Sequence, residues 1–204
     1  MDFDPSGTQE AVEQAKQALR RRMRSVRQAL PASAAQARSA RLIERVTRLQ
    51  GLHEANRVGL YWPIEGRREV DVTPLHGWLR ERGRAVYYPF MDPTEDGFRT
   101  GFRLANDSSQ LTSRGQRFLE PPPHCPEAPR QTLDVVVVPA LAADSRGYRL
   151  GYGSGFYDVT LPEHCPGGIA IVVIYHFQLL AELPVQDHDQ PAAFVVTDET
   201  TLKT

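Results

Sequence analysis

The sequence contains few cysteines, no long apolar run and no excess of basic residues. Cys125 and Cys165 are its only cysteines, which is too few for a disulfide scaffold. No apolar run approaches the ~18 residues needed to span a bilayer, and the acidic first residues lack the apolar core of a signal peptide. Lys and Arg number 24 against 25 Asp and Glu, so no global basic field favours nucleic-acid binding. We therefore expect a cytoplasmic protein that binds neither membranes nor nucleic acids.

Several familiar chemical motifs are also missing. Both cysteines lie in His-Cys-Pro tripeptides, but adjacent His and Cys are an uncommon spacing for zinc ligands and no C-x-x-C occurs. There is no Walker loop, and the spacing of Gly151, Gly153 and Gly155 differs from the dinucleotide fingerprint. Ser154 lacks the flanking residues of a G-x-S-x-G nucleophile motif. These absences argue against a zinc site, a P-loop or Rossmann nucleotide site and a serine nucleophile.

The hydrophobic pattern predicts the fold class. With 204 residues, of which 41% are hydrophobic, the chain suits a single domain over 1–204, and we expect residues 1–8 to be disordered. The β-branched runs at 133–138 and 169–174 are typical of central strands buried on both faces. Shorter strands are expected at 57–62 and 85–88, each stopped by a proline. The pattern indicates an α/β fold with a central mixed, mostly parallel sheet flanked by helices.

The remaining segments are assigned from helix formers and turn formers. Residues 8–50 are rich in Ala, Arg, Gln, Glu and Leu, and they predict two helices broken at Leu30-Pro31. Another helix is expected to begin near Thr73-Pro74 and to end before Gly83. Residues 91–130 contain most of the turn formers, so we expect loops and at most short strands there.

The most informative segment is 149–158, Arg-Leu-Gly-Tyr-Gly-Ser-Gly-Phe-Tyr-Asp. Glycines at alternate positions allow backbone N–H groups to converge on an anion, and Arg149 adds a positive charge. A tight turn that needs glycine only for its positive φ is the alternative interpretation. The flanking Arg149 and Asp158 favour a phosphate site, because Mg²⁺ bound to phosphate takes carboxylate oxygens as further ligands.

Residues 133–158, which include this loop, closely resemble the signature of the 5-formyltetrahydrofolate cyclo-ligase (methenyltetrahydrofolate synthetase) family. Supporting segments agree in the expected order: 16–20, 61–64 with 69–71, and 183–189 followed by 195–197. The resemblance implies a fold like that of sugar-phosphate isomerases and CoA transferases. It also implies an ATP- and Mg²⁺-dependent enzyme that cyclises 5-formyltetrahydrofolate to 5,10-methenyltetrahydrofolate and releases ADP and phosphate. We expect a monomer whose partners are these small molecules.

The resemblance also implies roles for individual residues. ATP would contact Lys16, Arg20, Arg149, Leu150, Gly151, Tyr152, Gly153, Ser154, Gly155, Phe156 and Tyr157. The folate substrate would contact Ile64, Glu69, Tyr152, Gly153, Ser154, Gly155 and Phe156, with Ile64 as an apolar wall and Glu69 near the formyl and pterin groups. Mg²⁺ would be held by Asp158 and Asp189.

Lys16 and Arg20 lie in a basic run, for which another interpretation exists. The run continues through Arg21, Arg22, Arg24 and Arg27 without an acidic residue, which is typical of a solvated helix face and, less often, of a nucleic-acid or anionic-membrane contact. Lys16 and Arg20 are four residues apart and share one helix face, so both can reach a polyphosphate. We assign these two to ATP and leave the other arginines on the solvated face.

The sequence departs from the family pattern at several positions. The family glutamate usually stands closer to the proline, which leaves a choice between Glu65 and Glu69, and Val70-Asp71 favours Glu69. Val159, Ala193 and Arg117 stand where the family often has arginine, an acidic residue and glycine. These departures leave open a second hypothesis, an ATP- or folate-binding member of the same fold with lost or altered chemistry.

Overall fold

The computed structural model describes residues 5–114 and 118–204 and is built around one seven-stranded sheet of order β12-β11-β9-β6-β1-β2-β3. The four inner pairings, β1 with β2, β1 with β6, β6 with β9 and β9 with β11, are parallel, and both edge pairings are antiparallel. The strands are β1 Arg57–Gly59, β2 Ala85–Thr94, β3 Gly97–Leu104, β6 Val135–Pro139, β9 Ile169–Val173, β11 Phe194–Val196 and β12 Thr201–Lys203. The expected mixed, mostly parallel sheet is confirmed.

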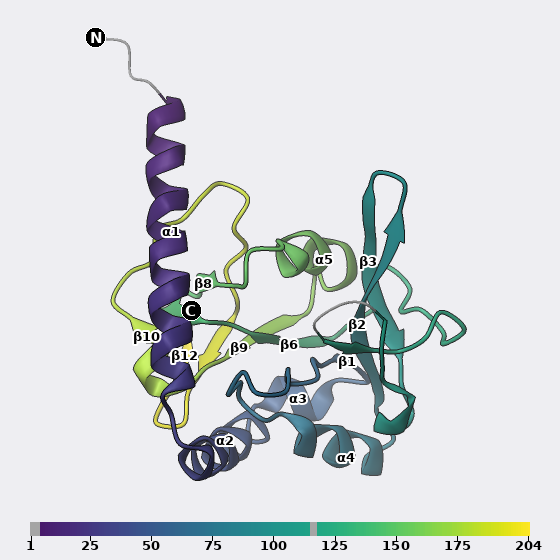
Figure 1. The fold of residues 1–204 in the computed structure, drawn as a ribbon. Coiled ribbons are helices and arrows are strands. Elements are labelled where there is room, and N and C mark those ends of the chain that lie inside the picture. Colours follow the sequence, from purple (N-terminus) through teal and green to yellow (C-terminus); the bar gives the residue numbers. More distant parts are fainter. Residues whose placement is uncertain (1–4, 115–117) are drawn as a thin grey trace.

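Helices cover both faces of this sheet (Figure 1). In Figure 1, α2, α3 and α4 lie below the sheet and α5 lies above it, while α1 stands at one end and the β2–β3 hairpin at the other. The helices are α1 Pro5–Gln28, α2 Ala32–Val46, α3 Gln50–Glu54, α4 Thr73–Glu81 and α5 Phe156–His164. None of the helices that the structure describes has the length and apolar character to span a bilayer.

Smaller elements complete the chain. A second sheet of order β10-β7-β8 packs with α1, and β4 pairs with β5. The short elements are η1 Ser108–Gln110, β4 Thr112–Ser113, β5 Leu119–Glu120, β7 Ala142–Asp144, β8 Arg149–Leu150, η2 His176–Gln178 and β10 Leu179–Leu180.

Strand β6 shows why a continuous apolar run belongs at the centre of the sheet. Val135 and Val137 pack into the core between the sheet and α2, α3 and α4. Val136 and Val138 pack into the core between the sheet and α5. All four are fully buried. Because successive side chains of a strand point to opposite faces, a strand covered on both sides needs apolar residues at every position.

The predicted break between the first two helices and the predicted bounds of α4 are confirmed, whereas the second helix ends at Val46, before the expected residue 50. α1 ends at Gln28, and Pro31 directly precedes α2, whose first turn has no need of the N–H that proline lacks. α4 begins at Thr73-Pro74 and ends at Glu81, two residues before Gly83. The expectation for residues 1–8 is untested: residues 1–4 lie outside the described part of the chain, and α1 begins at Pro5.

The expected end of the second strand at Pro89 is wrong. β2 continues through Pro89 to Thr94. Leu60 N donates to Tyr87 O on one side of β2, and Ala105 N donates to Val86 O on the other. Main-chain groups alternate between the two sides, so Pro89 faces the same side as Tyr87, beyond the end of β1. A proline is tolerated there because no neighbouring strand requires its N–H.

The expectation of only loops or short strands in 91–130 is wrong for the first part of that segment. β3 has eight residues and pairs with β2 from Tyr87 opposite Leu104 to Thr94 opposite Gly97. Glu95 and Asp96 connect the two strands, so the acidic and glycine residues there form a tight hairpin turn.

A network of charged groups stabilises this hairpin. The Asp92 carboxylate accepts hydrogen bonds from Arg99 at 2.8 Å, Arg114 at 2.9 Å and Arg103 at 3.1 Å. Arg103 is 1% exposed, and its guanidinium lies 3.7 Å from the centre of the Phe90 ring. The Arg103 hydrogen bond is the main cause that holds the pKa of Asp92 far below its ordinary value.

We expect Asp92→Asn to lower the free energy of unfolding by about 2 kcal/mol at neutral pH, because the arginines lose a charged acceptor. A depressed folded-state pKa contributes stability above the pKa of an unfolded aspartate, and this contribution is lost as the pH falls through the folded-state pKa. The difference between wild type and variant should therefore shrink below about pH 4. Urea unfolding at neutral and acidic pH measures this. Asp96→Asn, at the exposed hairpin turn, is the control, and an equal loss at both pH values would contradict the prediction.

Candidate active site

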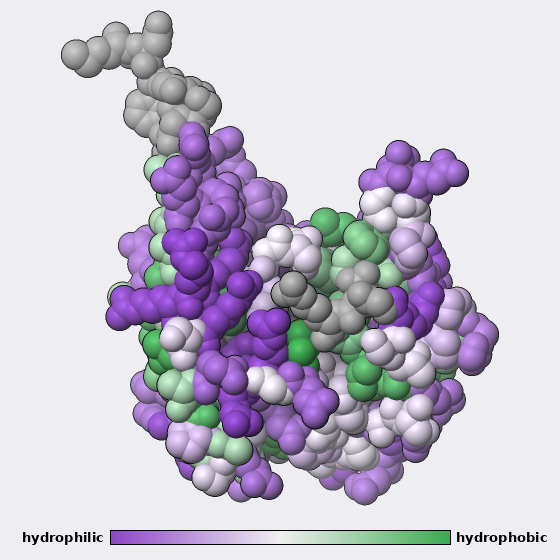
Figure 2. Space-filling model, in the orientation of Figure 1, coloured by the Kyte–Doolittle hydropathy of each residue, from purple (hydrophilic) through white to green (hydrophobic). Residues whose placement is uncertain are grey.

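A cavity of about 700 Å³ lies above the carboxyl ends of the central strands. Residues after β1, in the middle of β2 and at the end of β6 line it, which is where parallel α/β sheets bind ligands. Figure 2 shows the molecule hollowed between the hydrophilic side chains of α1 and the β2–β3 hairpin. Every site residue predicted from the sequence lines this cavity: Lys16, Arg20, Ile64, Glu69, Asp189 and all of Arg149–Asp158.

The glycine-rich segment forms the passage from β8 into α5. Gly153 and Gly155 have φ values of 107° and 68°, which side-chain-bearing residues rarely adopt, so glycine is required at both positions. Gly155 is the N-cap of α5, and among the described residues no side chain caps that helix end. Backbone N–H groups at an uncapped helix N-terminus favour an anionic ligand. The turn interpretation is therefore confirmed by the backbone, and anion binding by this loop stays a prediction.

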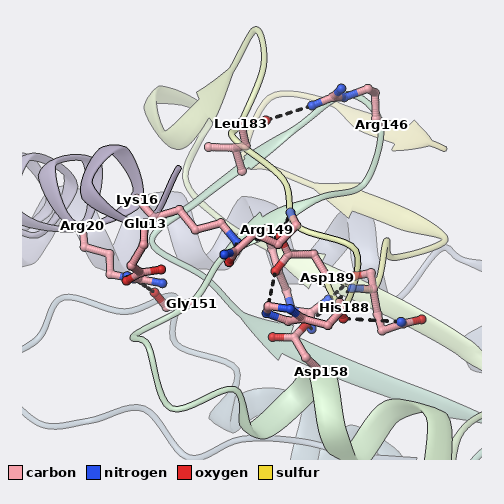
Figure 3. Close-up of polar contacts among 12 residues, drawn as sticks. Glu13, Lys16, Arg20, Arg146, Arg149, Gly151, Asp158, Leu183, His188 and Asp189 are labelled. Atoms are coloured by element: carbon pink, nitrogen blue, oxygen red, sulfur yellow. Dashed lines mark hydrogen bonds and ion pairs between the residues drawn. The ribbon is translucent and has the colours of Figure 1, made fainter. Parts of the chain in front are cut away.

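Three cations gather beside the loop (Figure 3). Lys16 Nζ lies 2.6 Å from Asp189 Oδ2 and 3.0 Å from Gln186 Oε1. Arg149 Nη2 donates to Asp158 Oδ1 at 2.6 Å. Arg20 crosses from α1 to the loop, where its Nε donates to the Gly151 carbonyl at 3.2 Å.

Arg149 is held deep in the site. Its side chain is 5% exposed, and burial lowers the pKa of its guanidinium, while the charge of Asp158 opposes that shift. Its Nη1 also donates to the Gln190 carbonyl at 2.5 Å. The guanidinium thus has a fixed orientation towards the cavity, and the carboxylate of Asp158 balances its positive charge.

A buried carboxylate marks the other end of the cavity. Glu69 is 7% exposed; its Oε2 accepts from Ile64 N at 2.6 Å, and its Oε1 accepts from the Tyr152 hydroxyl. Burial and then the Glu69 charge raise the pKa values of Tyr61, Tyr152 and Tyr157. The three phenols therefore stay protonated and can donate hydrogen bonds.

The structure distinguishes between the two candidate glutamates. Glu65 is exposed in the turn after Ile64 and does not line the cavity, whereas Glu69 lines it and is buried. Gly66, with a φ of 73°, and Arg68, with a φ of 53°, turn the chain between them. The two extra arginines of this loop thus lengthen the turn while Glu69 still reaches the cavity.

Two of the arginines assigned to a solvated face are not solvated. Arg27 is 3% exposed, and Arg24 lines the cavity and donates to the Tyr152 carbonyl at 3.1 Å. Arg21 and Arg22 are exposed, as expected. Positions 16, 20, 24 and 27 lie on one helix face, so their spacing of three and four residues could have predicted that all four point the same way. The run of like charges suggested a solvated face instead.

Sequence reasoning also missed the far wall of the cavity. Met91 and Phe98 from the hairpin, Phe118, and Trp62 after β1 give this wall an apolar surface. Three of these residues lie in the segment expected to consist mainly of loops, so no pattern placed them opposite the glycine loop. The cavity therefore has a cationic side on α1 and the glycine loop and an apolar side on the hairpin.

Departures from the family pattern lie away from the cavity where the structure describes them. Val159 is 56% exposed on α5 and Ala193 precedes β11, and neither lines the cavity. Arg117 lies outside the described residues. The described substitutions therefore leave the cavity walls intact.

Comparison with known proteins agrees with this geometry. The model of the 5-formyltetrahydrofolate cyclo-ligase family matches residues 12–198. The chain belongs to this family. It is therefore a ligase of folate one-carbon metabolism, and the expected enzyme class is confirmed.

Individual relatives of the family match most of the chain. The 5-formyltetrahydrofolate cyclo-ligase of Escherichia coli K12 is 34% identical over 149 residues, which cover 70% of this chain and 78% of the relative. The NMR structure of 5,10-methenyltetrahydrofolate synthetase from Aquifex aeolicus superposes with a TM-score of 0.78 at 27% identity and covers 92% of both chains. The synthetase from Mycoplasma pneumoniae, at 21% identity and a TM-score of 0.68, shares the fold over 90% of this chain.

Proposed function

We propose that the chain catalyses the ATP-dependent cyclisation of 5-formyltetrahydrofolate to 5,10-methenyltetrahydrofolate, with release of ADP and phosphate. The observation that carries the proposal is the convergence of an anion-binding loop, three cations and a buried carboxylate on one cavity. Its volume of about 700 Å³ is in the range usual for small-molecule sites. Family membership accounts for the folate, and the cationic side of the cavity supports ATP.

The proposed ATP half consists of Lys16, Arg20, Arg149 and the loop through Tyr157. The carboxylates of Asp189 and Asp158 neutralise Lys16 and Arg149 in the absence of a ligand. A polyphosphate would bring new acceptors for these cations and for the N–H groups at the start of α5. Phosphoryl transfer depends mainly on such positioning and charge neutralisation, which these residues are arranged to supply.

Asp158 and Asp189 suit a Mg²⁺ ion that arrives with the nucleotide. Both line the cavity beside the cations, and no group of three or more His, Cys, Asp and Glu among the described residues is placed to hold a metal by itself. Mg²⁺ commonly takes one or two protein carboxylates and completes its shell with phosphate oxygens and water. Bound there, the ion would neutralise phosphate charge. Lys16 and Arg149 would keep the two carboxylates oriented.

The proposed folate half lies at Glu69 and the apolar wall. In the reaction the formyl oxygen attacks the γ-phosphorus and ADP leaves. N10 then attacks the formyl carbon, the N10 proton is lost, and the C–O bond to phosphate breaks. The methenyl product carries a positive charge shared by N5 and N10. The Glu69 carboxylate would stabilise that charge as it develops, and Ile64 would contact the ring system.

A second candidate function is ATP or folate binding without turnover, as the departures from the family pattern suggest. It predicts tight ATP binding by a protein that forms no product. Val159 and Ala193 lie outside the cavity, which weighs against this candidate.

The proposal also includes a monomer in the cytoplasm. The buried free thiols of Cys125 and Cys165 suit a reducing compartment.

The deciding experiment follows the absorbance of methenyltetrahydrofolate during incubation with 5-formyltetrahydrofolate and Mg²⁺, with and without ATP. We expect a rise that requires ATP and that stops when a chelator removes Mg²⁺. Folded protein that produces no rise would contradict the proposal. If that protein still binds ATP, the second candidate replaces it.

A further inference from the structure

Arg27 is a buried cation behind the wall of the cavity. It lies in the last turn of α1, is 3% exposed and does not itself line the cavity. Its guanidinium contacts three groups. Nη1 lies 3.4 Å from the Ala140 carbonyl, Nη2 donates to the Tyr152 hydroxyl, and Nη2 lies 3.9 Å from Glu69 Oε1. Its centre also lies 5.5 Å from the centre of the Tyr152 ring.

These contacts fix the direction of the Tyr152 hydroxyl. A guanidinium has donors and no acceptor, so the hydroxyl proton cannot point at Arg27. The hydroxyl accepts from Arg27 and donates to Glu69 Oε1. A charge-assisted hydrogen-bond chain thus runs from α1 through the glycine loop to Glu69.

Among the described residues, Arg27 is the cation that forms an ion pair with the Glu69 carboxylate. The carboxylate accepts from the hydroxyl of Tyr152, and its charge also raises the pKa values of Tyr61, after β1, and of Tyr157, from α5. Tyr175, at the end of β9, donates to the Glu69 backbone carbonyl at 2.9 Å. Arg27 therefore places a positive charge beside a buried carboxylate whose hydrogen-bond donors, Ile64 N and the Tyr152 hydroxyl, are neutral.

We infer that Arg27 is a positioning residue of the folate half, which holds the Glu69 carboxylate in a fixed orientation through Tyr152. The inference rests on the proposed function, in which Glu69 stabilises the positive charge that develops on N5 and N10. Arg27 touches neither substrate in this scheme. Its effect is on the position and the electrostatic surroundings of Glu69.

The test compares Arg27→Met and Arg27→Lys with Arg22→Met, an exposed arginine of the same helix. For Arg27→Met we expect kcat to fall about tenfold near neutral pH, because Glu69 and Tyr152 lose their fixed orientation. We also expect the acid limb of the kcat profile to move up by about one pH unit, because a positive charge is lost beside the carboxylate. The KM for ATP should stay within about twofold of wild type, since the phosphate cations are untouched. In Arg27→Lys the acid limb should return most of the way to its wild-type position, and Arg22→Met should have the wild-type profile.

Thermal unfolding gives a readout that does not depend on activity. Without Arg27 the buried Glu69 carboxylate has no positive charge beside it, so the Tm loss of Arg27→Met should be larger near pH 8 than near pH 5. Adding Glu69→Gln should remove that pH dependence. An unchanged pH profile together with an equal Tm loss at both pH values would mean that Arg27 only docks α1, and would overturn the inference.

Two further outcomes are also decisive. If Arg27→Met does not fold, Tyr152→Phe removes the hydroxyl that connects Arg27 to Glu69. A rise of its acid limb supports the inference, and an unchanged limb overturns it. If wild-type protein lacks the cyclisation but the pH-dependent Tm loss is present, the proposed function fails while the coupling of Arg27 to Glu69 stands.

Discussion

Replacing Arg149 with alanine is expected to lower kcat/KM for ATP by about 10² to 10³-fold while the fold is preserved. The side chain of Arg149 is 5% exposed, against 6% for Lys16 and 15% for Arg20, and its position is fixed by bonds to Asp158 and Gln190. Its positive charge is therefore already oriented before ATP arrives. Initial rates at varied ATP measure the loss, and circular dichroism checks the fold.

The controls for Arg149→Ala separate charge, geometry and general surface effects. Arg149→Lys keeps the charge but loses the two-pronged hydrogen-bonding geometry, so an intermediate loss is expected. Asp158→Ala should also reduce turnover, because it removes a proposed Mg²⁺ ligand and the partner of Arg149. Arg22→Ala, on the exposed side of α1, should change little. Equal losses in Arg149→Ala, Asp158→Ala and Arg22→Ala would contradict the assigned roles.

The parts of the fold that follow local rules could be predicted from the sequence. The valine run of β6 predicted a strand buried on both faces, and Pro31 predicted the break between α1 and α2. The glycine loop could be predicted for a similar reason, because its conformation and its chemistry lie within ten consecutive residues, 149–158. Positive φ at Gly153 and Gly155 is a requirement of the local backbone.

Features that depend on distant partners could not be predicted in this way. Pro89 stops a strand only when a neighbouring strand needs its N–H, and the sequence does not reveal that β1 ends before that point. Arg27 looks like part of a solvated basic run, yet its partners Tyr152 and Ala140 lie more than a hundred residues away. A charge pattern along a helix shows which residues share a face, and it cannot show what covers that face.

Glu69→Gln is expected to lower kcat by about 10²-fold while leaving ATP binding unchanged. Glutamine has nearly the same shape and can still accept hydrogen bonds from Ile64 N and the Tyr152 hydroxyl. What it lacks is the negative charge that would stabilise the positive charge on N5 and N10. The loss should therefore appear in kcat with 5-formyltetrahydrofolate, and the Kd for ATP from calorimetry should stay at the wild-type value.

Glu65→Gln is the matched control for this prediction. It makes the same chemical change four residues away, at an exposed position outside the cavity, so wild-type kinetics are expected. Equal losses in the two variants would show that the loop tolerates neither change and that Glu69 has no special role. A fall in kcat confined to Glu69→Gln would assign the folate half of the reaction to the buried carboxylate. Glu69 is joined to Arg27 of α1 through Tyr152. The same result would therefore connect the folate chemistry to α1, the helix whose Lys16 and Arg20 line the proposed ATP half.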